Sequence, residues 1–185
     1  MPKENTTVYI ILGLLSHEDL SGYDIKKRID HQISFFWDVG YGQIYPTLSR
    51  LVADRLVTKR TSESSGGPEK NLYSITHQGR EVLKEWLKTP VQKEYTKYEI
   101  LVKLFFGHEV SFEENRERIE AFKVRQLETL KLMDMFKRNL EEVMDREEEH
   151  LFYYLTVLFG EKIFQAYVQW ADEAVNLLEA RYQKE

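Results

Sequence analysis

The hydrophobic and polar positions of the first 56 residues predict three short helices. Residues 7–15 are largely apolar and form the first expected helix, which a polar turn ends. Ser21 is placed to cap a second helix over about residues 22–30, because its side-chain oxygen can accept hydrogen bonds from the first turn. A third helix is expected over about residues 42–56. Its apolar residues form one continuous stripe: Ile44, Leu48, Leu51, Val52 and Leu56.

The opposite side of this third helix is polar. With an advance of about 100° per residue, that side carries Gln43, Pro46, Thr47, Arg50 and Asp54. Proline has no backbone N–H, so Pro46 fits best where that group would in any case lack a partner within the helix. We therefore expect the helix to begin near Gly42, with Pro46 in its unpaired first turn.

Two segments with the alternation and residue types of β-strands follow, at residues 57–61 and 71–75. The loop between them contains a Ser-Ser-Gly-Gly-Pro run at residues 64–68, which is either a flexible tip or a segment able to follow a DNA minor groove. Thr76 then caps a further helix over about residues 77–88.

The order helix, helix, helix, hairpin, helix is that of a winged helix-turn-helix. Thr89 and Pro90 end the last helix, since a residue before proline disfavours helical geometry. We therefore place a winged helix-turn-helix DNA-binding domain at residues 1–90, within a fold that is mainly α with a small β-hairpin.

The rest of the chain, residues 91–185, is expected to be helical. A short apolar helix covers about residues 95–106, and Ser111 with Glu114 forms a capping box at the start of a long helix reaching about residue 149. A charged break precedes a last helix over about residues 151–182. Both long helices have heptad-like apolar stripes that are wider than one partner covers. The pattern predicts an antiparallel helical domain that forms a homodimer.

Composition and charge describe a globular protein with an uneven charge distribution. The net charge of −5 divides into +1 for residues 1–90, with 12 Lys and Arg against 11 Asp and Glu, and −6 for residues 91–185, with 14 against 20. No apolar run approaches the roughly 20 residues of a membrane span, and the first residues lack the basic start and small-residue cleavage site of a signal peptide, so we expect neither. The absence of cysteine fits a reducing compartment, and we expect a cytoplasmic bacterial protein.

Patterns that support catalysis or metal binding are missing from the sequence. The five histidines have no i, i+4 pair, so neither a metal nor a cofactor is expected. Glycine-rich phosphate loops, nucleophile elbows and HExxH motifs do not occur, and the many carboxylates lie on amphipathic helices as solvated faces. The sequence therefore offers no catalytic residue, and we expect a protein that is not an enzyme.

The polar face of the third helix and the hairpin are the candidate DNA-binding elements. Arg50 can donate two hydrogen bonds to a guanine, Gln43 can bind an adenine or a phosphate, and Thr47 can touch a phosphate or a thymine methyl group. The alternative is an ordinary solvated helix face. The hairpin adds three cations that suit backbone phosphates beside the groove: Lys59, Arg60 and Lys70.

At these positions the chain resembles PadR-type transcriptional regulators. The motifs that carry the resemblance are SGYDI at residues 21–25, GQIYPTL at 42–48 with Leu51, YSIT at 73–76, Gly79, and LKEWL at 83–87. We include Tyr23 and Tyr45, which belong to these motifs, among the candidate DNA-contacting residues. The resemblance implies a winged helix that binds double-stranded DNA and a C-terminal dimerisation domain.

Two positions depart from the pattern of that family. Val52 stands where an acidic residue is usual, and Arg55 stands where a glycine is usual at the turn into the hairpin. Glycine would ease a left-handed turn at this position. An arginine in the same conformation costs about 1 kcal/mol.

The aromatic residues allow two interpretations. They fill the space between the two domains, or some of them line a cavity for a flat ligand. The resemblance favours the second, because PadR-like regulators respond to phenolic and other aromatic or drug-like compounds. The candidate effector-binding residues are Phe36, Trp37, Trp86, Tyr98 and Trp170.

The leading hypothesis is therefore a dimeric repressor that binds an inverted-repeat operator and is released by a small aromatic effector. The alternative is a winged-helix scaffold for protein interactions that has lost DNA binding. A scaffold has no need for cations that converge around a polar helix face, so Arg50 and the hairpin cations favour the first hypothesis.

Overall fold

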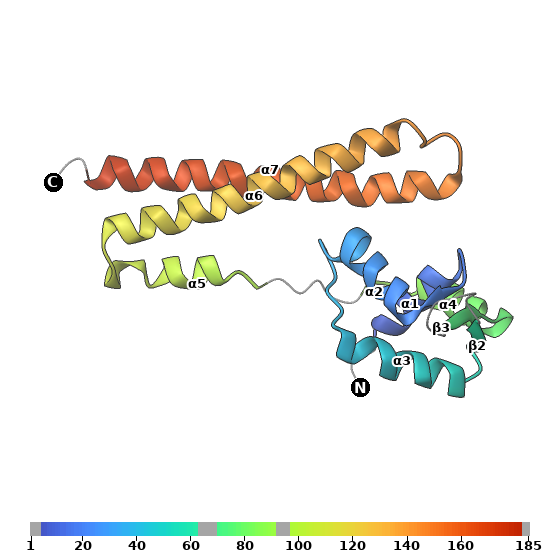
Figure 1. The fold of residues 1–185 in the computed structure, drawn as a ribbon. Coiled ribbons are helices and arrows are strands. Elements are labelled where there is room, and N and C mark those ends of the chain that lie inside the picture. The colour runs from blue at the N-terminus through green and yellow to red at the C-terminus, as the bar shows by residue number, and fades with distance from the viewer. Residues whose placement is uncertain (1–4, 63–69, 92–96, 183–185) are drawn as a thin grey trace. The chain divides into compact units, whose positions relative to one another are not determined.

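The computed structural model describes residues 5–62, 70–91 and 97–182. Contacts divide the chain into two compact units, an N-terminal unit of residues 1–94 and a C-terminal unit of residues 95–185. Figure 1 shows short helices and a small sheet in the first and long helices in the second. The predicted fold class, mainly α with a small β-hairpin, is confirmed.

The N-terminal unit contains a three-stranded antiparallel sheet in the order β1-β3-β2. Its elements are α1 (Thr7–Leu15), β1 (Leu20–Ser21), α2 (Gly22–Arg28), the π-helical turn η1 (Ile29–Ile33), α3 (Tyr41–Ala53), β2 (Val57–Ser62), β3 (Lys70–Ile75) and α4 (His77–Leu87). The expected hairpin is present as β2 and β3. The two-residue strand β1 was not predicted, since two residues are too few to show an alternation.

The predicted caps of α2 and α4 are confirmed. The Ser21 side chain accepts a hydrogen bond from the N–H of Asp24, whose carboxylate accepts one from the Ser21 N–H, so α2 begins with a full capping box. The Thr76 hydroxyl accepts from the N–H of Gly79 and donates to the carbonyl of Leu56. This second bond attaches the start of α4 to the end of the turn that precedes β2.

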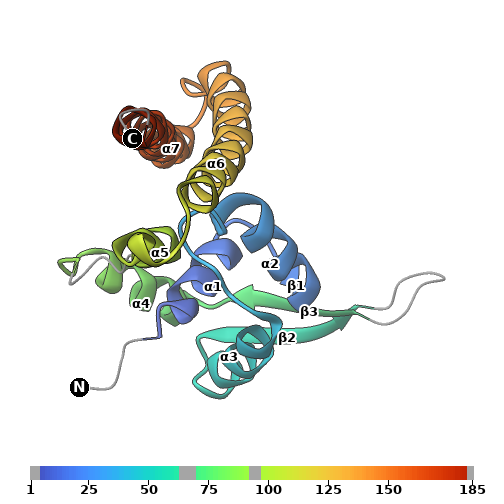
Figure 2. The same cartoon turned by 90° about the vertical axis from the view of Figure 1, so that its left-hand side faces the viewer.

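The core of the N-terminal unit is built from the apolar faces of its helices and one side of the sheet. Ile44, Leu48 and Leu51 of the predicted stripe are fully buried there, each removing apolar surface worth about 1.5–3 kcal/mol. Figure 2 shows α3 beside β2, with the hairpin strands leading away from the helices. This packing fixes which side of α3 faces solvent.

Two backbone details of α3 test expectations from the sequence. The helix begins at Tyr41 with Gly40 as its cap, so Pro46 lies in the second turn and the expectation that it falls in the unpaired first turn is wrong. The helix continues past Pro46 because its buried stripe outweighs the one hydrogen bond that proline cannot make. At the other end, Arg55 has a φ of 58°, which confirms the left-handed turn into β2.

The C-terminal unit consists of α5 (Glu99–Phe105), the 3-10 turn η2 (Gly107–Glu109), α6 (Phe112–Glu141) and α7 (Glu148–Tyr182). The predicted capping box of Ser111 and Glu114 is present. The helices α6 and α7 lie side by side and run antiparallel (Figure 1), around a core that includes Ile119, Phe122 and Ala171.

The turn between the long helices comes earlier than expected. Helix α6 ends at Glu141 instead of about residue 149, and α7 already begins at Glu148. Glu148 and Glu149 lie in the first turn of α7. Acidic side chains stabilise the N-terminus of a helix, so this charged run starts the last helix instead of ending the previous one. Across the described ranges, no helix combines the length and apolar character needed to cross a bilayer.

Candidate nucleic-acid interface

The solvent-facing side of α3 carries most of the residues predicted for it. Gln43, Tyr45 and Arg50 are exposed, and Ser49 joins them although the sequence analysis did not single it out. Within the described ranges, Arg50 makes no salt bridge, so its guanidinium is available to an external acceptor. One α-helical face with a free arginine, an amide and hydroxyls has the donors that read base edges in a major groove.

Thr47 does not belong to this exposed face. Its side chain is buried, with 5% of the residue exposed, so the prediction that it touches a phosphate or a thymine methyl group is corrected. Thr47 lies three residues after Ile44 and four before Leu51, and this spacing puts it on the buried stripe. Ser49 is exposed instead, and its hydroxyl donates to the carbonyl of Tyr45.

Tyr45 is positioned by the first residue of α2. A Cβ atom built on Gly22 would lie 2.6 Å from Cε1 of the Tyr45 ring, so the ring occupies the space that a larger residue would fill. Tyr23, the next residue of α2, is 59% exposed. Burial, and then the nearby Tyr45, raise the pKa of Tyr73 on β3 above its ordinary value. Tyr45 therefore lies against the start of α2 and near Tyr73 of β3.

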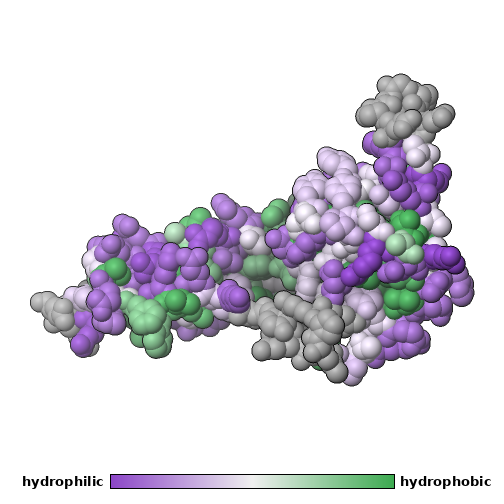
Figure 3. Space-filling view, turned by 90° about the horizontal axis from the view of Figure 1, so that it is seen from below, coloured by the Kyte–Doolittle hydropathy of each residue, from purple (hydrophilic) through white to green (hydrophobic). Residues whose placement is uncertain are grey.

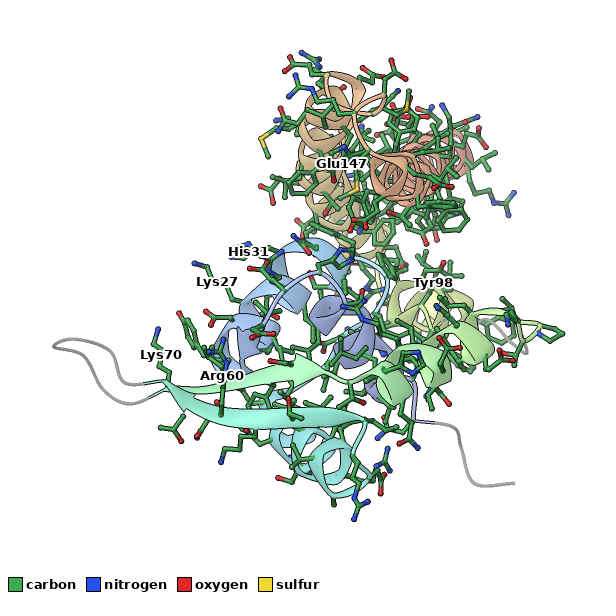
Figure 4. The ribbon with its side chains drawn as sticks, turned by 90° about the vertical axis from the view of Figure 1, so that its right-hand side faces the viewer. Lys27, His31, Arg60, Lys70, Tyr98 and Glu147 are labelled. Atoms are coloured by element: carbon green, nitrogen blue, oxygen red, sulfur yellow. The ribbon has the colours of Figure 1, made fainter. Side chains whose placement is uncertain are left out.

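The register of the hairpin separates its three candidate cations. Lys59 is paired with Tyr73, whose side chain is buried in the core, so Lys59 belongs to the side of the sheet that faces α3 and α1. Arg60 is paired with Leu72, one residue along, and therefore lies on the outer side. Lys70, two residues before Leu72, shares this outer side, and Figure 4 shows both cations on the hairpin.

The outer cations have carboxylates near them. The Arg60 guanidinium donates to the Asp19 carboxylate at 2.8 Å. A hydrogen bond from Ser74 and then the pair with Arg60 hold the pKa of Asp19 below its ordinary value. The bond from Ser21 lowers the pKa of Asp24 most, and Lys70 contributes to that lowering through its charge. In the described part of the chain, Lys59 makes no such ion pair.

The same side of the unit has a hollow of about 460 Å³. It is lined by acidic and basic side chains of α2, η1 and the segment before β1: Glu18, Asp19, Asp24, Lys27, Arg28 and His31, with Leu20 and Gln32. Figure 4 shows Lys27 and His31 on this wall. Arg28 is paired with Glu18 across the hollow. Its lining is mostly charged and polar, with Leu20 as the one apolar residue, so the hollow does not have the apolar walls that suit an aromatic ligand.

The candidate effector residues fall into both units. In the N-terminal unit, Phe36 and Trp37 are exposed by 59% and 41%, and Trp86 stacks on Tyr9 of α1 with ring centres 4.4 Å apart and planes at 6°. This stacking gives Trp86 a packing role between α4 and α1. None of the three residues is among those that line the hollow described above.

Tyr98 and Trp170 lie together in the C-terminal unit. They line a cavity of about 180 Å³ with Ile100, Leu101, Phe122 and Tyr167, which the sequence analysis did not select. The hydroxyl groups of Tyr98 and Tyr167 are hydrogen-bonded to each other. Burial and this bond raise the pKa of Tyr167 to about 12, so its hydroxyl stays protonated at neutral pH. The cavity is thus apolar, with a neutral hydroxyl pair at its wall.

No cluster of three His, Asp or Glu side chains that could hold a metal ion occurs in residues 5–62, 70–91 or 97–182. The Ser-Gly-Pro tip of the hairpin, for which a minor-groove contact was considered, lies outside the described residues. The interface is therefore described by α3, the start of α2 and the two hairpin strands.

Comparison with known proteins agrees with this geometry. Residues 11–85 match the model of the transcriptional regulator PadR-like family, and residues 96–179 match that of the virulence activator alpha C-terminal domain. The negative transcriptional regulator PadR of Bacillus subtilis is 30% identical over 92% of this chain and 96% of its own length.

Two solved structures of the Bacillus subtilis protein share the fold. PadR in complex with operator DNA has a TM-score of 0.82 at 26% identity, over 94% of this chain and 99% of that one. PadR in complex with p-coumaric acid has a TM-score of 0.78 at 26% identity, over 95% and 99%. The resemblance predicted from the motifs is confirmed: the chain belongs to the PadR-like family of transcriptional regulators.

Proposed function

We propose that this DNA-binding transcriptional regulator is a dimeric repressor that occupies an inverted-repeat operator and is released by a small aromatic ligand. The observation that carries the proposal is the exposed face of α3, on which Arg50 is free of ion pairs within the described residues. Arg50 reads a guanine, Gln43 binds an adjacent base or phosphate, and Lys59 binds the backbone beside the groove. Such a protein acts in the bacterial cytoplasm, where the operator is.

Dimerisation is supported by apolar surface on the C-terminal unit. Phe152, Leu155 and Phe159 of α7 recur at three- and four-residue intervals and are 49–67% exposed, so they form one uncovered stripe. Figure 3 shows hydrophobic surface on this unit among the polar side chains. A two-fold pair would cover such stripes and supply two recognition helices about 34 Å apart, one turn of DNA.

The effector is proposed to bind in the cavity of the C-terminal unit. A dry cavity of about 150 Å³ is known to accept one benzene ring, so about 180 Å³ suits a single substituted ring. The Tyr167 hydroxyl, neutral at pH 7, can donate a hydrogen bond to a carboxylate or phenol oxygen of that ring. The structure of the relative with p-coumaric acid supports this ligand class. Release from DNA follows if the ligand binds the DNA-free form more tightly.

The test is a selection of genomic duplexes at low salt with the full-length protein, followed by titration of the selected duplex. We expect one enriched inverted repeat, an affinity that falls steeply with salt, and loss of the complex when single-ring aromatic acids are added. If no duplex is enriched, the repressor is contradicted and the protein-interaction scaffold takes its place. If the operator is found but no aromatic compound shifts its affinity, the effector alone is contradicted.

A further inference from the structure

The cations of the DNA-binding unit are of two kinds. Arg50, on the exposed face of α3, and Lys59, on the side of the sheet that faces α3 and α1, make no salt bridge in the described part of the chain. Arg60, on the outer side of the hairpin, is held by Asp19 at 2.8 Å. A cation that already has an anionic partner must lose it before it can bind a phosphate.

The pair with Asp19 turns the Arg60 side chain away from the free edge of the sheet. The strand order is β1-β3-β2, so β2 is an edge strand and residues on it border free solvent. Arg60 is opposite Leu72 of β3, which is in turn opposite Ser21 of β1. Because Asp19 directly precedes β1, the pair draws the guanidinium inward across β3 and away from the free edge. A released arginine side chain is long enough to pass this edge toward a DNA backbone.

Asp19 is itself fixed by two strands. It receives a hydrogen bond from Ser74 on β3 as well as from Arg60 on β2. Its side chain is 39% exposed and that of Arg60 is 63% exposed, so the pair lies in solvent. Exposed pairs of this kind are opened at small cost, equivalent to at most about fivefold in an equilibrium constant. Asp19 therefore competes with a phosphate for Arg60 and lowers the affinity of that contact by up to about fivefold.

We propose that Asp19 is a positioning residue that withholds Arg60 from DNA phosphates and so limits sequence-independent binding. The inference rests on the proposed DNA binding. Phosphate contacts raise the affinity for every duplex and carry no sequence information. An intramolecular carboxylate that competes for one cation keeps the chain from being held on non-operator DNA.

The experiment compares wild-type protein and the Asp19→Asn variant on a random-sequence duplex over a range of salt concentrations. Asparagine keeps the hydrogen bond to Ser74 and removes the charge that holds Arg60. We expect the affinity at low salt to rise by up to about fivefold. We also expect the slope of log affinity against log salt to become steeper by about 0.9, the value of one added phosphate contact.

Two further variants separate release of Arg60 from a general change in charge. Glu81→Gln removes the same charge from a carboxylate of α4 that is paired with Lys84, and it should leave the affinity nearly unchanged. Arg60→Gln should have little effect in the wild type and should abolish the gain in the Asp19→Asn background.

The inference is overturned if Asp19→Asn and Glu81→Gln raise the affinity equally, or if the gain persists without Arg60. It is also overturned if Arg60→Gln lowers the duplex affinity of the wild type as much as it lowers that of Asp19→Asn. This comparison holds even if Asp19→Asn changes the stability of the protein. A wild-type protein that binds no duplex contradicts the proposed DNA binding itself. That outcome differs from the ones above, in which the wild type binds DNA and only the role of Asp19 fails.

Discussion

The ring of Tyr45 on α3 occupies the space above Gly22, the first residue of α2. A Cβ atom at Gly22 would lie 2.6 Å from Cε1 and 3.1 Å from Cζ of that ring. Tyr45 is 49% exposed on the face that carries Gln43 and Arg50, so one side of its ring is fixed by α2 and the other is open to a ligand. The glycine of the SGYDI motif thus sets the position of a residue in the GQIYPTL motif.

Gly22→Ala should weaken operator binding and leave the fold intact. The new methyl group displaces the end of the Tyr45 side chain, which can move, so the cost falls on the DNA-binding face. We expect the operator affinity to fall by about 1 kcal/mol, the scale of one lost contact. Gly13→Ala is the control, since a Cβ there meets nothing within 4 Å. Equal operator affinity for both variants would contradict the role of Gly22 in positioning Tyr45.

Arg55→Gly should stabilise the protein by about 1 kcal/mol. Arg55 is exposed and has a φ of 58°, a conformation that glycine adopts without the clash of a Cβ atom. Chemical denaturation measures the change in the free energy of unfolding. The control is Arg80→Gly at an exposed position inside α4, which should destabilise the protein by about 1 kcal/mol. The explanation fails if the two variants change stability in the same direction.

Local signals predicted most of the N-terminal unit. Ser21, Thr76 and Ser111 were predicted as caps from residue type alone, because a cap depends on neighbours within four residues. Thr47 was misplaced because a single helical wheel does not show how wide the buried stripe is. That width is set by the neighbouring helices and the sheet.

The parts of the site that depend on distant pairing could not be predicted. Strand pairing brings Asp19 to Arg60, 41 residues away, and the short β1 strand that does so has no periodic signal. Tyr167 reaches Tyr98 across 69 residues in the same way. The sequence predicts the last helix, on which Tyr167 lies, but only the packing of α5 against the long helices makes Tyr167 line a cavity.

Lys137→Met should destabilise the C-terminal unit by about 2 kcal/mol. Lys137 donates to both carboxylate oxygens of Glu161 at 3.1 Å, and Glu161 is 7% exposed, so the variant leaves a buried carboxylate without its closest partner. Replacing both residues with methionine should restore most of the stability in thermal denaturation. Arg138→Met, beside it but 74% exposed, should cost under about 1 kcal/mol. If the double variant is less stable than Lys137→Met, Lys137 does not compensate the buried charge of Glu161.

Tyr167 should make stability depend on pH in the alkaline range. Burial and the bond with Tyr98 raise the pKa of Tyr167 to about 12 in the folded protein, against about 10 in the unfolded chain. Its contribution is therefore fully present below pH 10 and is lost as the pH rises from about 10 to 12. The difference in unfolding free energy between wild type and Tyr167→Phe should be constant below pH 10 and decrease above it. A difference that is constant across this range would contradict the burial of the hydroxyl.

The most direct test of DNA reading by α3 is the affinity and base selectivity of Arg50→Ala on the selected operator, compared with Arg80→Ala on α4. We predict that Arg50→Ala costs about 1–3 kcal/mol and relaxes selectivity at one base position in each half-site, whereas Arg80→Ala changes neither. If Arg50→Ala keeps the wild-type affinity and selectivity, α3 does not read the operator.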